Sequence, residues 1–256
     1  MFMVNSKYSC QQCKDRGLII KNKEYAVPCN CVKQKSIAKH FQFANMSKEL
    51  LRCTFNNFSL DFYSETDYDH HSGNNSYKKL ALNALQASRR FCADYLQGHK
   101  GSGLMFTGQV GSGKTFLAAA IANELLKSKV NVLFAVVPDL LDEIKSTFNN
   151  NYKSDNTKDE LNLLKKLRDV DVLILDDLGV HNYTQWSNNK IYSIVNYRVN
   201  NSLPTIITTN LSLREMEELL GERTTSRIIQ MCHVYRLMVS KDIRHILRKK
   251  ASTNYK

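Results

Sequence analysis

The fold of this chain is decided by the stretch Gly108-Gln109-Val110-Gly111-Ser112-Gly113-Lys114-Thr115. The stretch fits the pattern G-x4-G-K-[ST], and it lies between a short apolar run at residues 104–107 and a helix-like run at residues 116–127. Glycines let the backbone N–H groups of such a turn wrap around phosphates, and the helix that follows directs the positive end of its dipole at them. A simple glycine-rich turn is the alternative, but it does not require this strand–turn–helix context.

We expect this stretch, called the phosphate loop below, to bind the phosphates of ATP. Lys114 would reach the β- and γ-phosphates, and the Thr115 hydroxyl would hold Mg²⁺. The expected nucleotide contacts comprise the whole loop and the residue after it: Gly108, Gln109, Val110, Gly111, Ser112, Gly113, Lys114, Thr115 and Phe116.

A pair of acids supplies the second half of such a site. Asp176 and Asp177 directly follow an apolar run at residues 170–175. Asp176 is expected to hold the magnesium shell, and Asp177, one residue beyond the strand, to orient or activate the attacking water. Two adjacent acids have no packing use at the end of an apolar strand, although a coincidental exposed pair is the alternative.

Strand-like and helix-like patterns alternate around these motifs. Apolar strand runs occur at residues 104–107, 130–137, 170–175 and 205–209, and helical patterns at 77–96, 116–127, 139–148, 160–168, 190–200 and 213–220. Continuous apolar strands separated by amphipathic helices indicate a parallel sheet covered on both faces. The sequence therefore predicts a three-layer α/β fold of the P-loop NTPase kind.

Hydrolysis also needs polar groups placed to meet the charge that develops on the phosphoryl oxygens. Asn210 ends the strand run at residues 205–209 and could reach the water or the γ-phosphate. Arg223 and Arg227 follow a short helix, and an arginine donated to a neighbouring subunit would couple hydrolysis to assembly. The alternative for both arginines is a surface ion pair with nearby acids such as Glu217 or Glu222.

Four cysteines near the N-terminus have metal-ligand spacing. Cys10 and Cys13 form a C-x2-C pair, Cys29 and Cys31 form a C-x-C pair, and a hairpin-like segment separates the two pairs. Four thiolates arranged in this way suit a closed structural zinc site, which would supply most of the folding energy of so small a module. Four unrelated reduced thiols are the alternative, and His40 could substitute as a ligand. The remaining cysteines are expected to be small buried apolar residues: Cys53, Cys92 and Cys232.

Composition narrows the partner class and the compartment. Lys and Arg total 36 against 24 Asp and Glu, so the formal net charge is +12. That balance favours binding to polyanions such as nucleic acid. The alternative is that the lysines only keep the surface solvated. No run approaches the roughly 20 apolar residues that cross a bilayer, and residues 1–10 lack an apolar signal core. A cytoplasmic protein without membrane contact is expected.

The order of these motifs resembles the AAA+ ATPases, and within them the helicase loaders of the DnaC and DnaI type and their relative, the IstB transposition helper. The resemblance covers roughly residues 46–245. It rests on the phosphate loop, Leu175-Asp176-Asp177-Leu178-Gly179, Asn196-Tyr197-Arg198, residues 204–211 and residues 221–227. It implies two regions: a zinc-binding, partner-contacting module with a helical linker at residues 1–45, and an AAA+ ATPase domain at residues 46–256.

The resemblance also implies roles for individual residues. Asn210 is similar to the sensor 1 residue, Arg227 to the arginine finger, and Arg244 to the sensor 2 arginine. Phe55 and Phe58 match a segment that flanks the adenine.

The function implied is ATP-dependent loading of a replicative helicase, a ring-shaped hexamer, onto single-stranded DNA. The N-terminal region would grip the helicase, and Arg227 would join subunits into an ATP-dependent oligomer. The segment with Lys145, Phe148, Tyr152 and Lys153 mixes bases with aromatics, so it is either a DNA contact or a solvated loop. Two other functions stay open: a transposition helper on double-stranded DNA, and a zinc-containing DNA-binding adaptor whose nucleotide site is largely structural.

Overall fold

The computed structural model describes residue 10, residues 13–21, 25–29, 31, 44–99, 101–149, 156–180 and 183–253. Near the N-terminus, β1 (Leu18–Lys21) and β2 (Tyr25–Pro28) form an antiparallel hairpin in which Ile19 is opposite Val27. The hairpin expected between the two cysteine pairs is therefore present.

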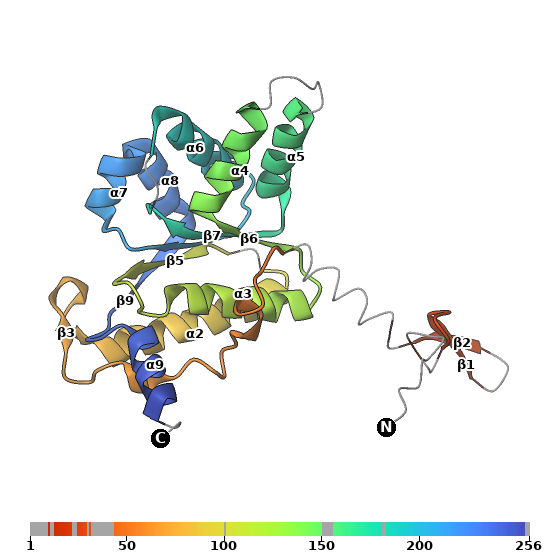
Figure 1. Ribbon diagram of the computed structural model, residues 1–256, viewed down its shortest axis with the longest axis horizontal. Helices are drawn as coiled ribbons and strands as arrows, with labels where there is room; N and C mark the ends of the chain where they lie inside the picture. Colours follow the sequence, from red (N-terminus) through yellow and green to blue (C-terminus); the bar gives the residue numbers. More distant parts are fainter. Residues whose placement is uncertain are drawn as a thin grey trace.

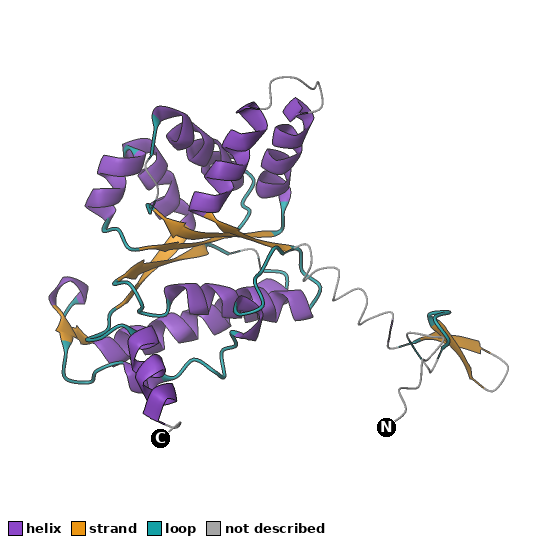
Figure 2. Ribbon diagram, viewed as in Figure 1, coloured by secondary structure: helices purple, strands orange, loops and turns teal. Residues whose placement is uncertain are grey.

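A five-stranded sheet in the order β6-β7-β8-β5-β9 forms the centre of the remaining chain, and each neighbouring pair is parallel. The strands are β5 (Gly103–Gly108), β6 (Val132–Val136), β7 (Val172–Leu178), β8 (Thr205–Thr209) and β9 (Cys232–Leu237). Figure 2 shows the sheet as an orange layer between two purple layers of helices. The predicted three-layer α/β fold is confirmed.

The helices divide between the two faces of the sheet (Figure 1). One face carries α2 (Tyr77–Leu96), α3 (Lys114–Lys127) and α9 (Ile243–Thr253). The other carries α4 (Val137–Asn149), α5 (Asn156–Asp169), α6 (Gln185–Asn200), α7 (Leu213–Leu220) and α8 (Glu222–Met231). Each helical layer encloses its own buried apolar cluster against the sheet. None of the helices in the described part of the chain is long and apolar enough to span a lipid bilayer.

Several elements follow directly from the residues at their ends. Helix α2 begins where Ser76 accepts a hydrogen bond from the Lys79 amide. Helix α7 begins with a reciprocal capping box, in which Ser212 and Glu215 each accept from the other's backbone N–H. These local signals explain why the predicted first residues of both helices agree with the structure.

Other predictions need correction. The third predicted strand continues through both acids to Leu178, with an irregular register between Leu175 and Leu178, so Asp177 lies inside the strand rather than beyond it. Helix α8 and strand β9 were not predicted. Residues 64–76, whose polar sequence is typical of a loop, hold the short elements β3 (Tyr68–Asp69), η3 (His70–Ser72) and β4 (Asn75–Ser76). Two 3-10 turns precede this segment: η1 (Leu50–Arg52) and η2 (Leu60–Phe62).

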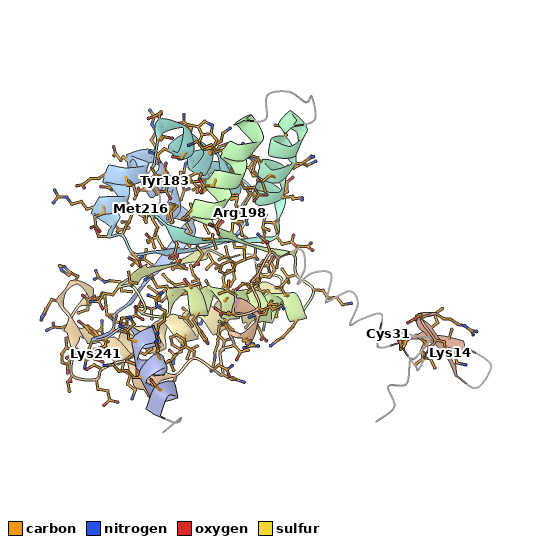
Figure 3. The ribbon with its side chains drawn as sticks, in the orientation of Figure 1. Lys14, Cys31, Tyr183, Arg198, Met216 and Lys241 are labelled. Atoms are coloured by element: carbon orange, nitrogen blue, oxygen red, sulfur yellow. The ribbon has the colours of Figure 1, made fainter. Side chains whose placement is uncertain are left out.

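Arg198 is a fully buried cation that ties helix α6 to the sheet (Figure 3). Its guanidinium donates to Thr205 Oγ1 at 2.8 Å, to the Val170 carbonyl at 2.8 Å and to the Pro204 carbonyl at 2.7 Å. Burial lowers the pKa of Arg198 to about 10, so the group stays charged at neutral pH. A buried guanidinium needs this full set of acceptors, and they come from the segments leading into two neighbouring strands.

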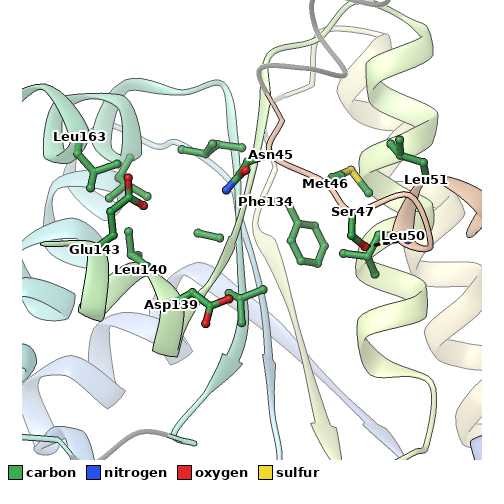
Figure 4. A pocket seen from close by; sticks show the side chains of 14 residues that line it. Asn45, Met46, Ser47, Leu50, Leu51, Phe134, Asp139, Leu140, Glu143 and Leu163 are labelled. Atoms are coloured by element: carbon green, nitrogen blue, oxygen red, sulfur yellow. Dashed lines mark hydrogen bonds between the residues drawn. The ribbon is translucent and has the colours of Figure 1, made fainter. Parts of the chain in front are cut away.

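An apolar pocket of about 680 Å³ lies beside the edge strand β6 (Figure 4). Its walls come from residues 45–51, from β6 and from helices α4 and α5. The chain runs along this edge, because the Phe134 amide donates to the Ala44 carbonyl at 2.9 Å. None of the residues lining this pocket belongs to the phosphate loop or to the acid pair.

Candidate nucleotide site and cysteine cluster

The phosphate loop connects β5 directly to α3, as the sequence predicts. Gly108, Gly111 and Gly113 all have positive φ angles, which residues with side chains rarely adopt. There is also no room for a side chain at two of these positions. A side-chain carbon at position 108 would lie 2.1 Å from the Leu237 carbonyl oxygen, and one at position 113 would lie 2.8 Å from the Tyr63 hydroxyl. Glycine is therefore required for both conformation and packing.

Lys114 is buried inside the loop. Its Nζ donates to the carbonyls of Gly108 at 2.9 Å and Gln109 at 2.6 Å. Burial lowers the pKa of Lys114 to about 8, while the charges of Asp177 and Asp176 act in the opposite direction. A second donor lies nearby, since the Ser112 hydroxyl is buried and has no hydrogen-bond partner among the described residues. The loop therefore fits an anionic ligand such as a phosphate.

Asp176 is buried near the carboxyl end of β7 and accepts a hydrogen bond from Thr208 Oγ1 at 2.7 Å. Burial raises the pKa of Asp176 to about 6, and hydrogen bonds from Thr208 and Thr115 partly offset this. The structure therefore brings the two expected magnesium ligands, Thr115 and Asp176, into contact. A hydroxyl and a carboxylate oxygen form the hard donor set that Mg²⁺ prefers.

Asp177 has a positive φ of 56°, and its amide donates to Thr208 Oγ1 at 2.9 Å. Thr208 thus contacts both acids, a role that the sequence did not indicate. Asn210 is exposed and directly follows β8, next to the end of β7, because Thr209 is paired with Leu178. The expected water-orienting residues therefore lie at one edge of the sheet.

Arg227 lies elsewhere, on helix α8, where its guanidinium donates to Gln230 Oε1 at 2.9 Å. Within the described residues, neither Arg223 nor Arg227 forms an ion pair, and no hydrogen bond joins Arg227 to the phosphate loop or the acids of its own chain. The alternative interpretation, a surface ion pair with Glu217 or Glu222, is therefore not seen among the described residues. Among the described residues, Arg227 is therefore not joined to the candidate site of its own chain.

Arg244 lies beside the phosphate loop. The Ile243 amide, one residue earlier, donates to the Gly111 carbonyl at 3.1 Å. Arg244 pairs with Asp242 at 2.7 Å, and its charge contributes to lowering the pKa of Lys114. The structure therefore brings this expected nucleotide contact to the loop.

Aromatic side chains cover the other side of the loop. Tyr63 donates to the Ser112 carbonyl at 2.7 Å, and the Phe58 ring lies 5.6 Å from that of Tyr63 and 5.8 Å from that of Phe116. Phe55 instead lies under the Arg89 guanidinium, 6.0 Å from ring centroid to cation. Of the two phenylalanines expected near the adenine, only Phe58 packs against the loop. Tyr63 was not expected there, and the sequence offers only a weak signal, a second aromatic residue shortly after Phe58.

The four N-terminal cysteines converge as predicted. Cys10 Sγ lies 3.7 Å from Cys29 Sγ, Cys13 Sγ lies 3.4 Å from Cys31 Sγ, and all four sulfurs fall within 4.8 Å of one another. Tetrahedral zinc with bonds of about 2.3 Å requires sulfurs about 3.8 Å apart, so this cluster fits the ion. The Gly17 amide also donates to Cys13 Sγ at 3.4 Å.

The pKa of Cys31 in this cluster rises to about 12, first through hydrogen bonding with Cys13 and then through burial. Crowded sulfurs resist ionisation in this way unless a cation neutralises them. Of the isolated cysteines, Cys92 and Cys232 are buried as expected, whereas Cys53 is partly exposed. His40 lies outside the described residues.

The candidate DNA segment is only partly described. Lys145 is exposed on α4, which also contains Phe148, and Tyr152 and Lys153 lie outside the described residues.

Comparisons with known proteins agree with this geometry. Residues 77–251 match the family model of the IstB-like ATP binding protein. The replicative helicase loader DnaC of Escherichia coli K12 is 37% identical over 147 residues, which are 57% of this chain and 57% of that protein. The chain thus spans less than two thirds of this relative's length.

Two solved structures are similar over most of the chain. The crystal structure of DnaI superposes with a TM-score of 0.59 at 28% identity, covering 77% of this chain and 94% of that one. The crystal structure of the DnaC helicase loader gives a TM-score of 0.56 at 28% identity, covering 76% and 100%.

Proposed function

Since the chain belongs to the IstB-like ATP-binding family and is an AAA+ protein of the DnaC and DnaI loader type, we propose that it loads a replicative DNA helicase onto single-stranded DNA at the expense of ATP. Membership of this family supports ATPase activity, and the coupling of that activity to helicase loading is part of the proposal. The observation that carries the proposal is the convergence of the buried Lys114 with Thr115 and Asp176 at the end of a parallel sheet.

Nucleotide binding follows from the loop. Lys114 is buried, and its two carbonyl partners hold it inside the loop, where phosphate oxygens would replace them. The backbone amides at the start of α3 add the positive end of the helix dipole. The rings of Phe58 and Phe116 offer an apolar surface beside the loop for the adenine.

Hydrolysis would depend on the acid pair, Asp176 and Asp177. Thr115 and Asp176 would hold Mg²⁺, which supplies positive charge to the phosphoryl oxygens. Asp177 orients the attacking water and accepts its proton, and Asn210 donates a hydrogen bond at the same edge of the sheet.

Assembly would complete the site. A guanidinium without an ion-pair partner in the described part of its own chain is suited to the phosphates of a neighbouring subunit. Arg227 of one chain would therefore act at the phosphate loop of the next, so that the oligomer forms when ATP is bound.

The N-terminal region, with zinc held by Cys10, Cys13, Cys29 and Cys31, would contact the helicase ring. Single-stranded DNA would bind through basic groups that include the segment from Lys145 to Lys153. The net charge of +12 supports a polyanionic partner.

Co-purification with a replicative helicase tests this proposal. A tagged wild-type chain should retain the helicase, and ATP should change the amount of single-stranded DNA captured by the complex, whereas Lys114→Ala should lose the ATP effect. Failure to retain any replicative helicase, together with filaments on double-stranded DNA, would favour the transposition helper. An Asp177→Asn variant with undiminished steady-state ATPase would favour the adaptor.

A further inference from the structure

The carboxylate of Asp242 occupies the space beside Gly111 of the phosphate loop. A side-chain carbon at position 111 would lie 2.1 Å from Asp242 Oδ1 and 2.4 Å from Oδ2. The next residue, Ile243, donates its amide to the Gly111 carbonyl at 3.1 Å. The loop and the segment that leads into α9 therefore pack directly against each other, and the Asp242 carboxylate takes the space that a side chain at position 111 would need.

Asp242 holds the Arg244 side chain through several hydrogen bonds. Arg244 Nη2 lies 2.7 Å from Oδ2, and Nε lies 3.1 Å from Oδ1 and 3.3 Å from Oδ2. This bidentate arrangement fixes the plane of the guanidinium and leaves its remaining N–H groups for another acceptor. Because the Asp242 carboxylate lies against Gly111, the guanidinium that it holds lies beside the phosphate loop.

The segment carrying this pair is anchored independently of it. Gln109 Oε1 accepts from the Val239 amide at 3.1 Å, and Ser240 donates to Asp67. Upstream in β9, Arg236 forms an ion pair of 3.0 Å with the buried Asp69. Asp242 therefore projects from a fixed backbone and can define where Arg244 points.

We propose that Asp242 is a positioning residue that orients Arg244 toward the transferring γ-phosphoryl group of ATP. This inference rests on the proposed ATPase function and extends it to a residue that no motif marks. Free arginine side chains lose considerable rotamer entropy when they bind, and a preformed partner removes much of that cost before the substrate arrives. The oriented guanidinium then contributes to the transition state without reorganising.

A purely structural role for Asp242 is the rival explanation. Its Oδ1 also accepts from the Arg244 amide at 2.8 Å, which is an N-cap interaction for α9. Asparagine caps helices as well as aspartate does, but it carries no charge to pair with arginine. Asp242→Asn therefore keeps the cap and removes the ion pair.

The test is a kinetic cycle with Asp242→Asn, Arg244→Gln and the double variant, measured by single-turnover ATP hydrolysis. Loss of a carboxylate charge acts alike on bound ATP and on its transition state, so it changes KM and not kcat. Loss of arginine orientation lowers kcat, and we expect about a tenfold decrease for Asp242→Asn, as befits a charged hydrogen bond. In the Arg244→Gln background, Asp242→Asn should have no further effect on kcat.

The matched control is Glu218→Gln, which neutralises the acid of another arginine pair, Arg214 with Glu218 at 3.2 Å, on the surface of α7. It should leave kcat unchanged, and thermal unfolding should show that Asp242→Asn is folded. An unchanged kcat in Asp242→Asn, or an equal decrease in the Arg244→Gln background, would overturn the inference alone. No hydrolysis by the wild-type chain would instead remove the proposed function on which it rests.

Discussion

Thr208 Oγ1 donates to Asp176 Oδ1 at 2.7 Å and joins the carboxyl ends of two neighbouring strands, β7 and β8. The same oxygen accepts from the Asp177 amide at 2.9 Å. One hydroxyl therefore fixes both acids of the candidate site. Without it, the buried carboxylate would lose a donor that favours its ionised form.

Thr208→Val should lower ATP hydrolysis by about tenfold, because it removes a hydrogen bond to a charged group while keeping the shape of the side chain. Steady-state ATPase assays at saturating Mg²⁺ provide the measurement. Thr208→Ser restores a hydroxyl and is the control. Equal activity of the valine and serine variants would show that the hydroxyl has no such role.

Asp176 should make the protein less stable as the pH rises. Its folded pKa, about 6, is above its ordinary value, so its contribution to stability is complete below the unfolded pKa near 4 and is lost as the pH rises through 6. Asp176→Asn should therefore raise the Tm more at pH 8 than at pH 4, by an amount corresponding to about 2–3 kcal/mol at most. The same variant should lose Mg²⁺-dependent hydrolysis. A variant whose Tm gain is the same at both pH values would contradict the cause we assign.

How much of this could be predicted from sequence depended on the range of the interactions. Helix α7 and strand β8 have local signals, a capping box and an apolar run, and their bounds agree with the structure. Strand β9 has no such signal, because it is an edge strand with exposed His233 and with Arg236 paired to the distant Asp69. Its position depends on pairing with β5, which no local pattern encodes.

The candidate site shows the same division. The phosphate loop and the acid pair are contiguous motifs, so their residues could be named in advance. Three further residues were not named in advance, because each contacts a partner far away in the sequence. Thr208 contacts Asp176, 32 positions away, Tyr63 contacts Ser112, 49 positions away, and Asp242 contacts Gly111, 131 positions away. Only the folded chain brings these partners together.

Arg198 should be the most sensitive core position outside the site. Arg198→Met would leave the carbonyls of Val170 and Pro204 without their donor, and we expect a loss of about 3–5 kcal/mol in the free energy of unfolding. Urea denaturation provides the measurement, with the exposed Arg214→Met as control. A loss similar to that of the control would mean that the buried network contributes little.

Cys13→Ser should abolish zinc binding, because three thiolates no longer close the tetrahedron. Metal analysis of the purified wild-type chain should find one zinc per chain, and that of the variant markedly less. Cys53→Ser, outside the cluster, should retain the metal. ATP affinity should be equal in all three proteins, and a wild-type chain without zinc would contradict the assignment.

Arg227→Ala should bind ATP normally but hydrolyse it slowly, if the arginine acts on a neighbouring subunit. Mixing this variant with Lys114→Ala should restore part of the activity, because a mixed interface combines one intact phosphate loop with one intact arginine. Arg223→Ala is the matched control from the same helix. Two inactive variants that stay inactive when mixed would contradict action between subunits.

Calorimetric titration of the chain with ATP in the presence of Mg²⁺ tests the central claim most directly. We expect one nucleotide bound per wild-type chain, and an affinity at least about tenfold weaker for Lys114→Ala, which removes a charge-assisted contact to the phosphates. A wild-type chain that takes up no adenine nucleotide, or a Lys114→Ala chain that binds it equally well, would contradict the account.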